Sequence, residues 1–143
     1  MIAFERTAGR TEAPWYRSVG AGARLGTVLT TLAAIFLAFD TVMKVLKLGP
    51  AVEGTVVLGY PVESVQRIGL VELMCLVLYL VPRTSVLGAL LLTGYLGGAI
   101  ATHVRIGNPL FTHILFPIYV ALFVWGGLYL RDTRLRDVLP LRK

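Results

Sequence analysis

The sequence has little charge and almost no cysteine. Only 15% of its 143 residues are Asp, Glu, Lys or Arg, whereas an average soluble domain has about 25%. Cys75 is the single cysteine, which excludes a disulfide scaffold and thiol–disulfide chemistry within this chain. Hydrophobic residues make up 56% of the chain, too many for a disordered protein. With a mean hydropathy of +0.74, this composition predicts a small integral membrane protein.

Long apolar segments account for this composition. Four runs without strand-like alternation hold 17 to 24 residues each, at about 25–48, 65–81, 86–104 and 114–130. A helix over each run is about 25–36 Å long, enough to cross the hydrocarbon core. Helices also satisfy their own backbone hydrogen bonds, as lipid requires. We therefore expect an all-α fold, namely a transmembrane four-helix bundle.

Basic residues lie mostly outside these runs. Ten of the 14 Lys and Arg residues lie in the two tails and in the connection that carries Arg83. The positive-inside rule then predicts that the N- and C-termini face the cytoplasm, across the cytoplasmic membrane. We expect a cytoplasmic segment 1–24, a membrane domain 25–130 and a basic cytoplasmic tail 131–143. No basic run is interleaved with aromatics, so the expected partner is the lipid bilayer and not nucleic acid.

Two further features follow from this topology. The connection 49–64 is apolar but broken by glycine and proline and is too short to span, so it either lies flat on the outer surface or folds back as a cap. Aromatic residues are expected at the cytoplasmic interface, where their amphipathic rings suit the headgroup region. These are Trp15, Tyr16, Tyr79, Trp125 and Tyr129.

Ionisable residues within the expected spans are few, and each is costly in lipid. Asp40 and Lys44 lie four residues apart and share one face of the first helix. From the expected helix ends, Asp40 lies about 12 Å deep, Lys44 about 6 Å and Glu72 about 10 Å. His103 lies within about 2 Å of the outer end of the third helix. These depths predict one outward-opening polar pocket with Glu72, Asp40, Lys44 and His103 as candidate catalytic residues.

Neighbouring residues complete the candidate site. Tyr95, Thr102, Arg67 and Arg105 are the candidate ligand-binding residues; Tyr95 lies about 14 Å below the outer end of the third helix, and the other three lie nearer the outer ends of their helices. Gly69, Gly94 and Gly98 are candidate helix-packing positions, and the last two form a small-xxx-small pair. The two histidines lie ten residues apart and are weak metal ligands, so no metal site is expected.

Each of these residues also has a purely structural interpretation. Asp40 and Lys44 form a self-neutralising pair if Lys44 extends toward the interface. Glu72 alone in lipid is protonated, or it pairs with Lys44 across the bundle. His103 makes an ordinary interfacial hydrogen bond, and Tyr95 packs in the core with a satisfied hydroxyl group. Under these interpretations the polar residues only fix the register of the helices.

The order of these features resembles a known family. FDTVMKVLKLG ends the first helix, RIGLVELMCLVLYLVPRTSVLGALLL covers the second, and GYLGGAIATHVRIGNP ends the third. This arrangement, over about residues 25–130, is similar to DoxX-like proteins, small bacterial four-helix membrane proteins. The matching motif positions are Lys44, Gly69, Glu72, Gly98, Thr102 and His103.

The resemblance implies a redox-associated function. The family takes its name from a subunit of a thiosulfate:quinone oxidoreductase, and relatives are associated with oxidative-stress and thiol redox complexes. It therefore implies a quinone-like or lipid-like ligand in the pocket, no covalently bound cofactor, and a redox-protein partner or a second copy of the chain. Two alternatives stay open. One is an acid/base enzyme that isomerises an apolar substrate or opens an epoxide, and the other is a non-catalytic scaffold or assembly subunit.

Overall fold

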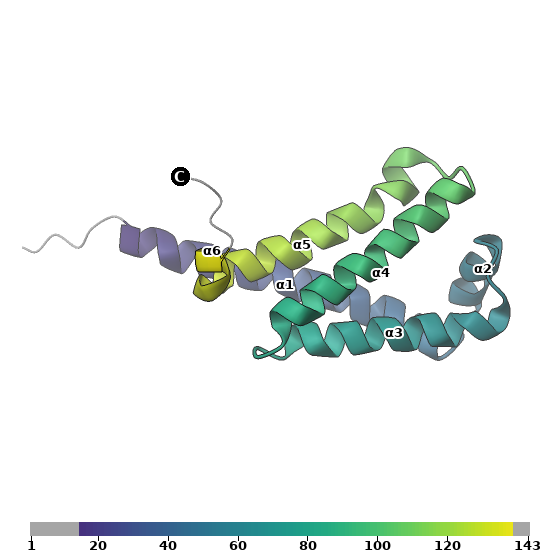
Figure 1. The fold of residues 1–143 in the computed structure, drawn as a ribbon, viewed down its shortest axis with the longest axis horizontal. Helices are drawn as coiled ribbons and strands as arrows, with labels where there is room; N and C mark the ends of the chain where they lie inside the picture. Colours follow the sequence, from purple (N-terminus) through teal and green to yellow (C-terminus); the bar gives the residue numbers. More distant parts are fainter. Residues whose placement is uncertain (1–14, 139–143) are drawn as a thin grey trace, which may run out of the picture.

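The computed structural model describes residues 15–138, which form helices joined by short turns (Figure 1). No strand occurs in this part of the chain, so the all-α class is confirmed. The elements are α1 (Trp15–Val45), α2 (Gly49–Val57), α3 (Val62–Leu80), α4 (Ser85–Arg105), the π-helix η1 (Leu110–Ile114), α5 (Phe116–Arg131) and α6 (Thr133–Val138).

Helix bounds differ from the predicted apolar runs mainly at α1 and at the fourth run. α1 begins at Trp15 and crosses the expected boundary between residues 24 and 25. It ends near Lys47, whose positive φ of 51° leaves the helical region. The π-helix η1 precedes the fourth run and overlaps it only at Ile114, and α5 begins at Phe116 with Pro117 in its first turn. Residues 1–14 and 139–143 of the expected cytoplasmic parts lie outside the described residues.

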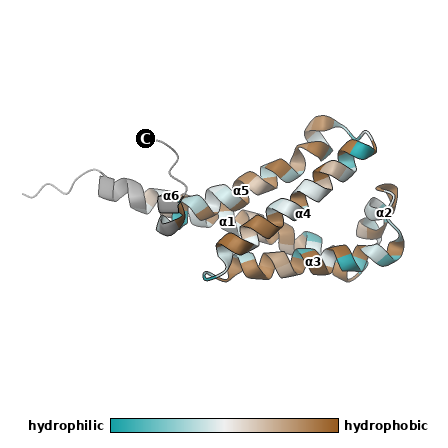
Figure 2. Ribbon diagram, viewed as in Figure 1, coloured by the Kyte–Doolittle hydropathy of each residue, from teal (hydrophilic) through white to brown (hydrophobic). Residues whose placement is uncertain are grey.

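In the described part of the chain, three helical stretches are long and apolar enough to cross a membrane: Gly20–Val45, Ser85–Arg105 and Leu110–Arg131. α3 is long enough, but its 19 residues include Glu63, Arg67 and Glu72. The outer surface agrees with a lipid environment, because large apolar side chains such as Ile35, Phe39 and Leu122 are more than 60% exposed. Figure 2 shows hydrophobic residues along the coloured parts of α1, α3, α4 and α5.

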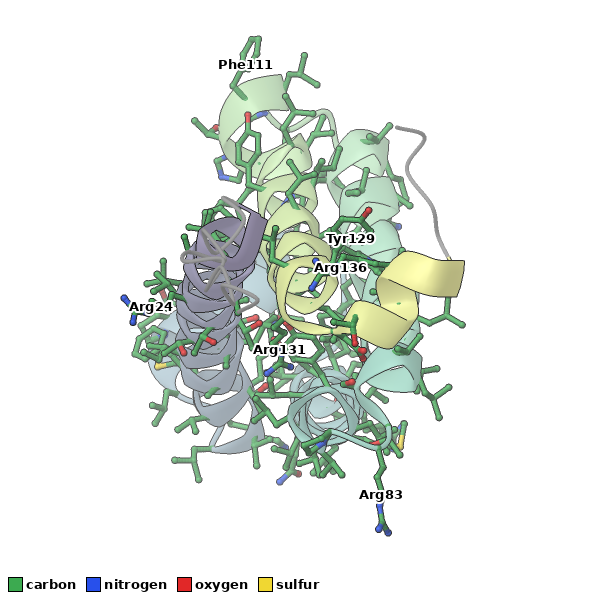
Figure 3. All side chains as sticks on the ribbon, turned by 90° about the vertical axis from the view of Figure 1, so that its left-hand side faces the viewer. Arg24, Arg83, Phe111, Tyr129, Arg131 and Arg136 are labelled. Carbon is green, nitrogen blue, oxygen red and sulfur yellow. The ribbon has the colours of Figure 1, made fainter. Side chains whose placement is uncertain are left out.

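The long helices pack side by side. α1 contacts α3 and α5, and α4 contacts the same two helices. The start of α1, the turn between α3 and α4, and α6 lie at one end of the molecule, whereas α2 and η1 lie at the other (Figure 1). We call the latter the α2 end. Figure 3 views the opposite end, where Arg24, Arg83 and Arg131 lie.

Glycines allow the closest helix approaches. At the α1–α5 crossing, a Cβ added to Gly26 would lie 2.8 Å from Leu130 Cβ, and one added to Gly127 would lie 2.5 Å from Thr30 Oγ1. At the α3–α4 turn, a Cβ on Gly88 would overlap the backbone of Tyr79. Such contacts leave no room for a side chain, so these glycines set the spacing between the helices.

Tyr79 corrects one prediction. It is fully buried, and its hydroxyl donates to the Val124 carbonyl at 3.0 Å and contacts Thr30 Oγ1 at 3.3 Å. The expected place of Tyr79 in an interfacial aromatic belt is therefore wrong. The hydroxyl group found partners on α5 and α1, which makes burial inside the protein favourable for an amphipathic ring.

Candidate functional site

Lys44 is the centre of a polar cluster at the α2 end. Its ammonium group donates to Asp40 Oδ2 one turn earlier on α1, to Glu72 Oε2 on α3 at 3.1 Å and to the Tyr95 hydroxyl on α4 at 2.8 Å. Tyr95 in turn donates to Glu72 Oε2 at 2.9 Å. One lysine thus joins three helices and bonds to three other predicted site residues, of which Glu72 and Tyr95 also bond to each other.

The contacts of Lys44 use all of its donors. An ammonium group has three N–H bonds, and here each is directed to a different side chain. Lys44 therefore has no N–H left to offer a ligand unless one of these bonds breaks. Its role in this arrangement is to hold Asp40 and Glu72 in place and to offset their charge.

Glu72 is the least exposed member of the cluster. Its side chain is 0% exposed, against 34% for Asp40 and 17% for Lys44. One carboxylate oxygen, Oε2, accepts from Lys44 and Tyr95. The other, Oε1, is buried and has no hydrogen-bond partner among the described residues. A buried polar atom without a partner is rare in folded proteins and often marks a functional position.

A cavity of about 420 Å³ lies beside this cluster. Asp40, Lys44, Glu72 and Tyr95 line one part of it, and His103 belongs to the same lining. Apolar walls come from α1, α4 and α5 through Phe36, Leu37, Leu96, Phe116, Pro117 and Val120. The volume lies in the usual range of small-molecule sites, about 300–1,000 Å³.

α2 forms part of the cavity wall. Pro50, Ala51, Gly54 and Thr55 of this helix belong to the lining, and α2 contacts both α1 and α3. Of the two expectations for the connection 49–64, the structure thus shows the one that folds back over the helix ends. The short helix starts where Pro50 occupies its first turn and ends before Gly59, whose φ is +85°.

Two histidines lie on the side of the cavity that α4 and η1 form. The rings of His103 and His113 meet edge to face with centroids 5.6 Å apart. Asn108 Nδ2 lies 2.7 Å from His103 Nδ1, and Thr112 Oγ1 lies 2.8 Å from His113 Nδ1. If Asn108 donates, Nδ1 of His103 is the acceptor and its Nε2 carries the proton. The side-chain hydrogen bond of His103 goes to Asn108 and not to the Lys44 cluster, although His103 shares the cavity.

The other candidate ligand-binding residues lie elsewhere. Thr102 hydrogen-bonds to the Tyr60 hydroxyl at 2.9 Å, and Arg105 donates to the Leu58 carbonyl at 2.6 Å. Both therefore tie the end of α2 and the loop after it to α4. Arg67 is exposed and does not line the cavity.

The predicted packing glycines differ from one another. A Cβ on Gly69 would lie 2.7 Å from Lys44 Cβ, so this glycine lets α3 approach α1 next to the cluster. Gly94 and Gly98 are exposed, and an added Cβ there would meet no atom within 4 Å. Within residues 15–138, no neighbouring helix fills the space that a side chain at either position would take.

Sequence reasoning missed several residues of the cavity. Asn108 lies between the predicted third and fourth runs, where span prediction treats the chain as a connection, and Phe116 lies inside the fourth run, where one more apolar residue gives no sign of a site. The Gly107–Pro109 turn was the available signal, because a turn residue beside His103 can return its side chain to the helix end. Within residues 15–138, no group of three or more His, Cys, Asp or Glu side chains is placed to hold a metal ion.

The long helices are apolar, their outer surface is apolar, and they enclose a buried charged cluster. These features identify the chain as a small membrane protein. The chain belongs to the DoxX-like family, whose pattern matches residues 28–127. The matched region contains α3 and α4 whole, together with most of α1 and α5, and so includes the entire Lys44 cluster. No curated protein and no solved structure shows a significant match to the chain.

Proposed function

We propose that this chain is a four-span protein of the cytoplasmic membrane, with both termini in the cytoplasm and the α2 end facing outward. α3 serves as the fourth span because Glu72 is buried against Lys44 and its other charges, Glu63 and Arg67, lie near the α2 end. The arginines of the opposite end, seen in Figure 3, agree with a cytoplasmic location under the positive-inside rule.

The cavity, in this proposal, holds the polar head of a quinone-like or lipid-like molecule. One observation carries it: Glu72 lines the cavity, and its buried Oε1 has no hydrogen-bond partner among the described residues. A ligand hydroxyl that donates to this oxygen would satisfy it. The walls from α1, α4 and α5 are largely apolar, which suits a ring or a chain more than a sugar or a nucleotide.

Of the two ligand kinds, the donor and acceptor set favours a quinol. A quinol hydroxyl can donate to Glu72 or Asp40, and a ring oxygen can accept from Nε2 of His103. Transfer of a hydroxyl proton to a carboxylate would assist oxidation of the quinol. Cys75 is buried and stands alone, so electrons would pass between the quinol and a redox-protein partner and not through this chain.

A binding experiment on Glu72→Gln tests this function. The purified protein in lipid nanodiscs is titrated with a short-tailed benzoquinol, and binding is followed by native mass spectrometry. We expect the variant to bind about tenfold more weakly, because glutamine cannot offer the same charged acceptor. Glu63→Gln on the same helix is the matched control, since Glu63 is exposed and does not line the cavity.

The two alternatives make different predictions in this experiment. If the cluster only fixes the register of the helices, Glu72→Gln and the unchanged protein bind the quinol equally or not at all, and the proposed function is wrong. If the chain is an acid/base enzyme, the isolated protein turns over an apolar epoxide or an isomerisable substrate, and Glu72→Gln abolishes that turnover.

A further inference from the structure

A second hollow lies between α3 and α4 at the α2 end. Its volume is about 290 Å³. Ile68 of α3 and Gly94, Gly98 and Ala99 of α4 form its apolar sides, and Leu58 lies at the end nearest α2. We call this hollow the side groove. Since Gly94 and Gly98 are exposed on the outer surface of α4, the groove opens toward the surrounding lipid.

The side groove adjoins the cavity of the Lys44 cluster. Lys44, Thr55, Leu58 and Tyr95 line both hollows. The hydrogen-bonded pair of Lys44 and Tyr95 therefore stands at their boundary, with one hollow on either side. A molecule that reaches from one to the other passes directly beside the cluster.

Polar groups of the groove already have partners. Thr55 Oγ1 donates to the Ala51 carbonyl at 2.7 Å, and the Tyr60 and Thr102 hydroxyls lie 2.9 Å apart. Lys44 and Tyr95 are bonded within the cluster. The side chains of the groove thus offer an occupant no free donor, whereas Glu72 of the cavity keeps an acceptor atom, Oε1, without a partner among the described residues. Such a surface suits a hydrocarbon chain and not a polar head.

The two glycines give the groove its depth. A Cβ on Gly94 or Gly98 would meet no atom within 4 Å, so no helix of this chain uses the space that the missing side chains leave. A leucine there would extend into the groove without displacing backbone. Gly97 is also exposed with nothing within 4 Å, yet it does not line the groove, which makes it a matched control on the same helix.

From these observations we infer that the side groove binds the isoprenoid tail of the molecule whose head occupies the cavity. The inference rests on the proposed function for the identity of the head. Head and tail would enter together from the lipid between α3 and α4, and the tail would lie along Gly94 and Gly98. The head would then be beside Tyr95 and Glu72.

Two photoreactive probes test this inference in nanodiscs. One is an isoprenoid benzoquinone with a diazirine on its tail, and the other is the isoprenoid alcohol with the same diazirine and no ring. Cross-linked peptides are mapped by mass spectrometry. We expect both probes to label the segments around Ile68 and Ala99, and Gly94→Leu to reduce this labelling about tenfold by filling the groove. Gly97→Leu is expected to leave it unchanged.

The outcomes separate the two proposals. Labelling spread evenly over the lipid-facing helices, or labelling that Gly94→Leu does not reduce, overturns the tail site. If the groove is labelled but the ring adds nothing and Glu72→Gln has no effect, the tail site stands and the proposed function fails. Stronger groove labelling by the quinone, which Glu72→Gln reduces to the level of the alcohol, supports both.

Discussion

The ammonium group of Lys44 allows the carboxylate of Glu72 to be buried. A carboxylate with no exposure, such as that of Glu72, is tolerated only when it is paired and hydrogen-bonded. Lys44 supplies the charge, and Tyr95 supplies a second bond to the same oxygen. The cluster holds two carboxylates and one ammonium group, so it carries an excess of negative charge when both carboxylates are ionised.

Removing the ammonium group tests this dependence. Lys44→Met leaves the carboxylate of Glu72 buried without its partner, so we expect the free energy of unfolding to fall by about 3 kcal/mol. The measurement is denaturation in detergent micelles followed by circular dichroism. Lys47→Met is the control, because Lys47 is exposed and outside the cluster. A second change, Glu72→Gln in the Lys44→Met background, is expected to restore most of the loss. Equal stability of both lysine variants would contradict the argument.

Helix periodicity predicts polar contacts within one helix, but it does not predict contacts between helices. The spacing of Asp40 and Lys44 places them on one face, and this contact holds. The approach of Glu72 was one of several options, because it depends on how closely α3 packs on α1. Gly69 allows that approach, and its effect becomes visible only with both helices in place. The full use of the lysine donors could not be foreseen, since the position of Tyr95 relative to Lys44 is a tertiary property.

Among the elements, the α1–α5 pair illustrates how glycine sets helix spacing. Gly26 and Gly127 lie where the two backbones come closest. Small residues at such crossings allow close van der Waals packing, which is the main attraction between helices in lipid. Sequence reasoning assigned this role to Gly94 and Gly98 on α4 and did not consider Gly127. A glycine pattern in one helix does not reveal which face meets a neighbour.

Adjacent glycines on α5 provide a matched test. We expect Gly127→Ala to lower the free energy of unfolding by about 2 kcal/mol, because its Cβ would lie 2.5 Å from Thr30 Oγ1. Gly126→Ala is expected to be neutral or slightly stabilising, since its Cβ would lie at an ordinary 3.7 Å from Leu29 Cδ1. Thermal unfolding in detergent compares the two variants. A similar midpoint for both would show that the crossing adjusts freely.

For the molecule as a whole, the apolar runs predicted where the long helices lie, but they predicted the helix ends and the connections less well. Hydropathy located the four long helices α1, α3, α4 and α5, because their outward-facing side chains are largely apolar. It did not find the start of α1 at Trp15, where polar and small residues continue the helix. It left two possibilities for 49–64, because a nine-residue helix with an apolar surface fits a membrane surface as well as a cap.

Orientation can be measured with single cysteines. Cys75 is buried and is first replaced by serine, after which Glu53→Cys on α2 and Arg83→Cys in the α3–α4 turn place thiols at opposite ends. With intact cells and a membrane-impermeant maleimide, we expect Glu53→Cys to be labelled and Arg83→Cys to be labelled only after lysis. The reverse pattern would invert the proposed topology. Labelling at both positions in intact cells would contradict a four-span arrangement.

The length of α1 has a mechanical consequence. Its 31 residues extend about 46 Å, whereas the hydrocarbon core measures about 30 Å, so part of the helix stands in the aqueous or headgroup layer. Between Arg24 and Lys44 it runs about 30 Å without a break or a proline. A protein that binds the N-terminal end of α1 would therefore hold the same continuous helix that carries the Lys44 ammonium group at the α2 end, about 30 Å away.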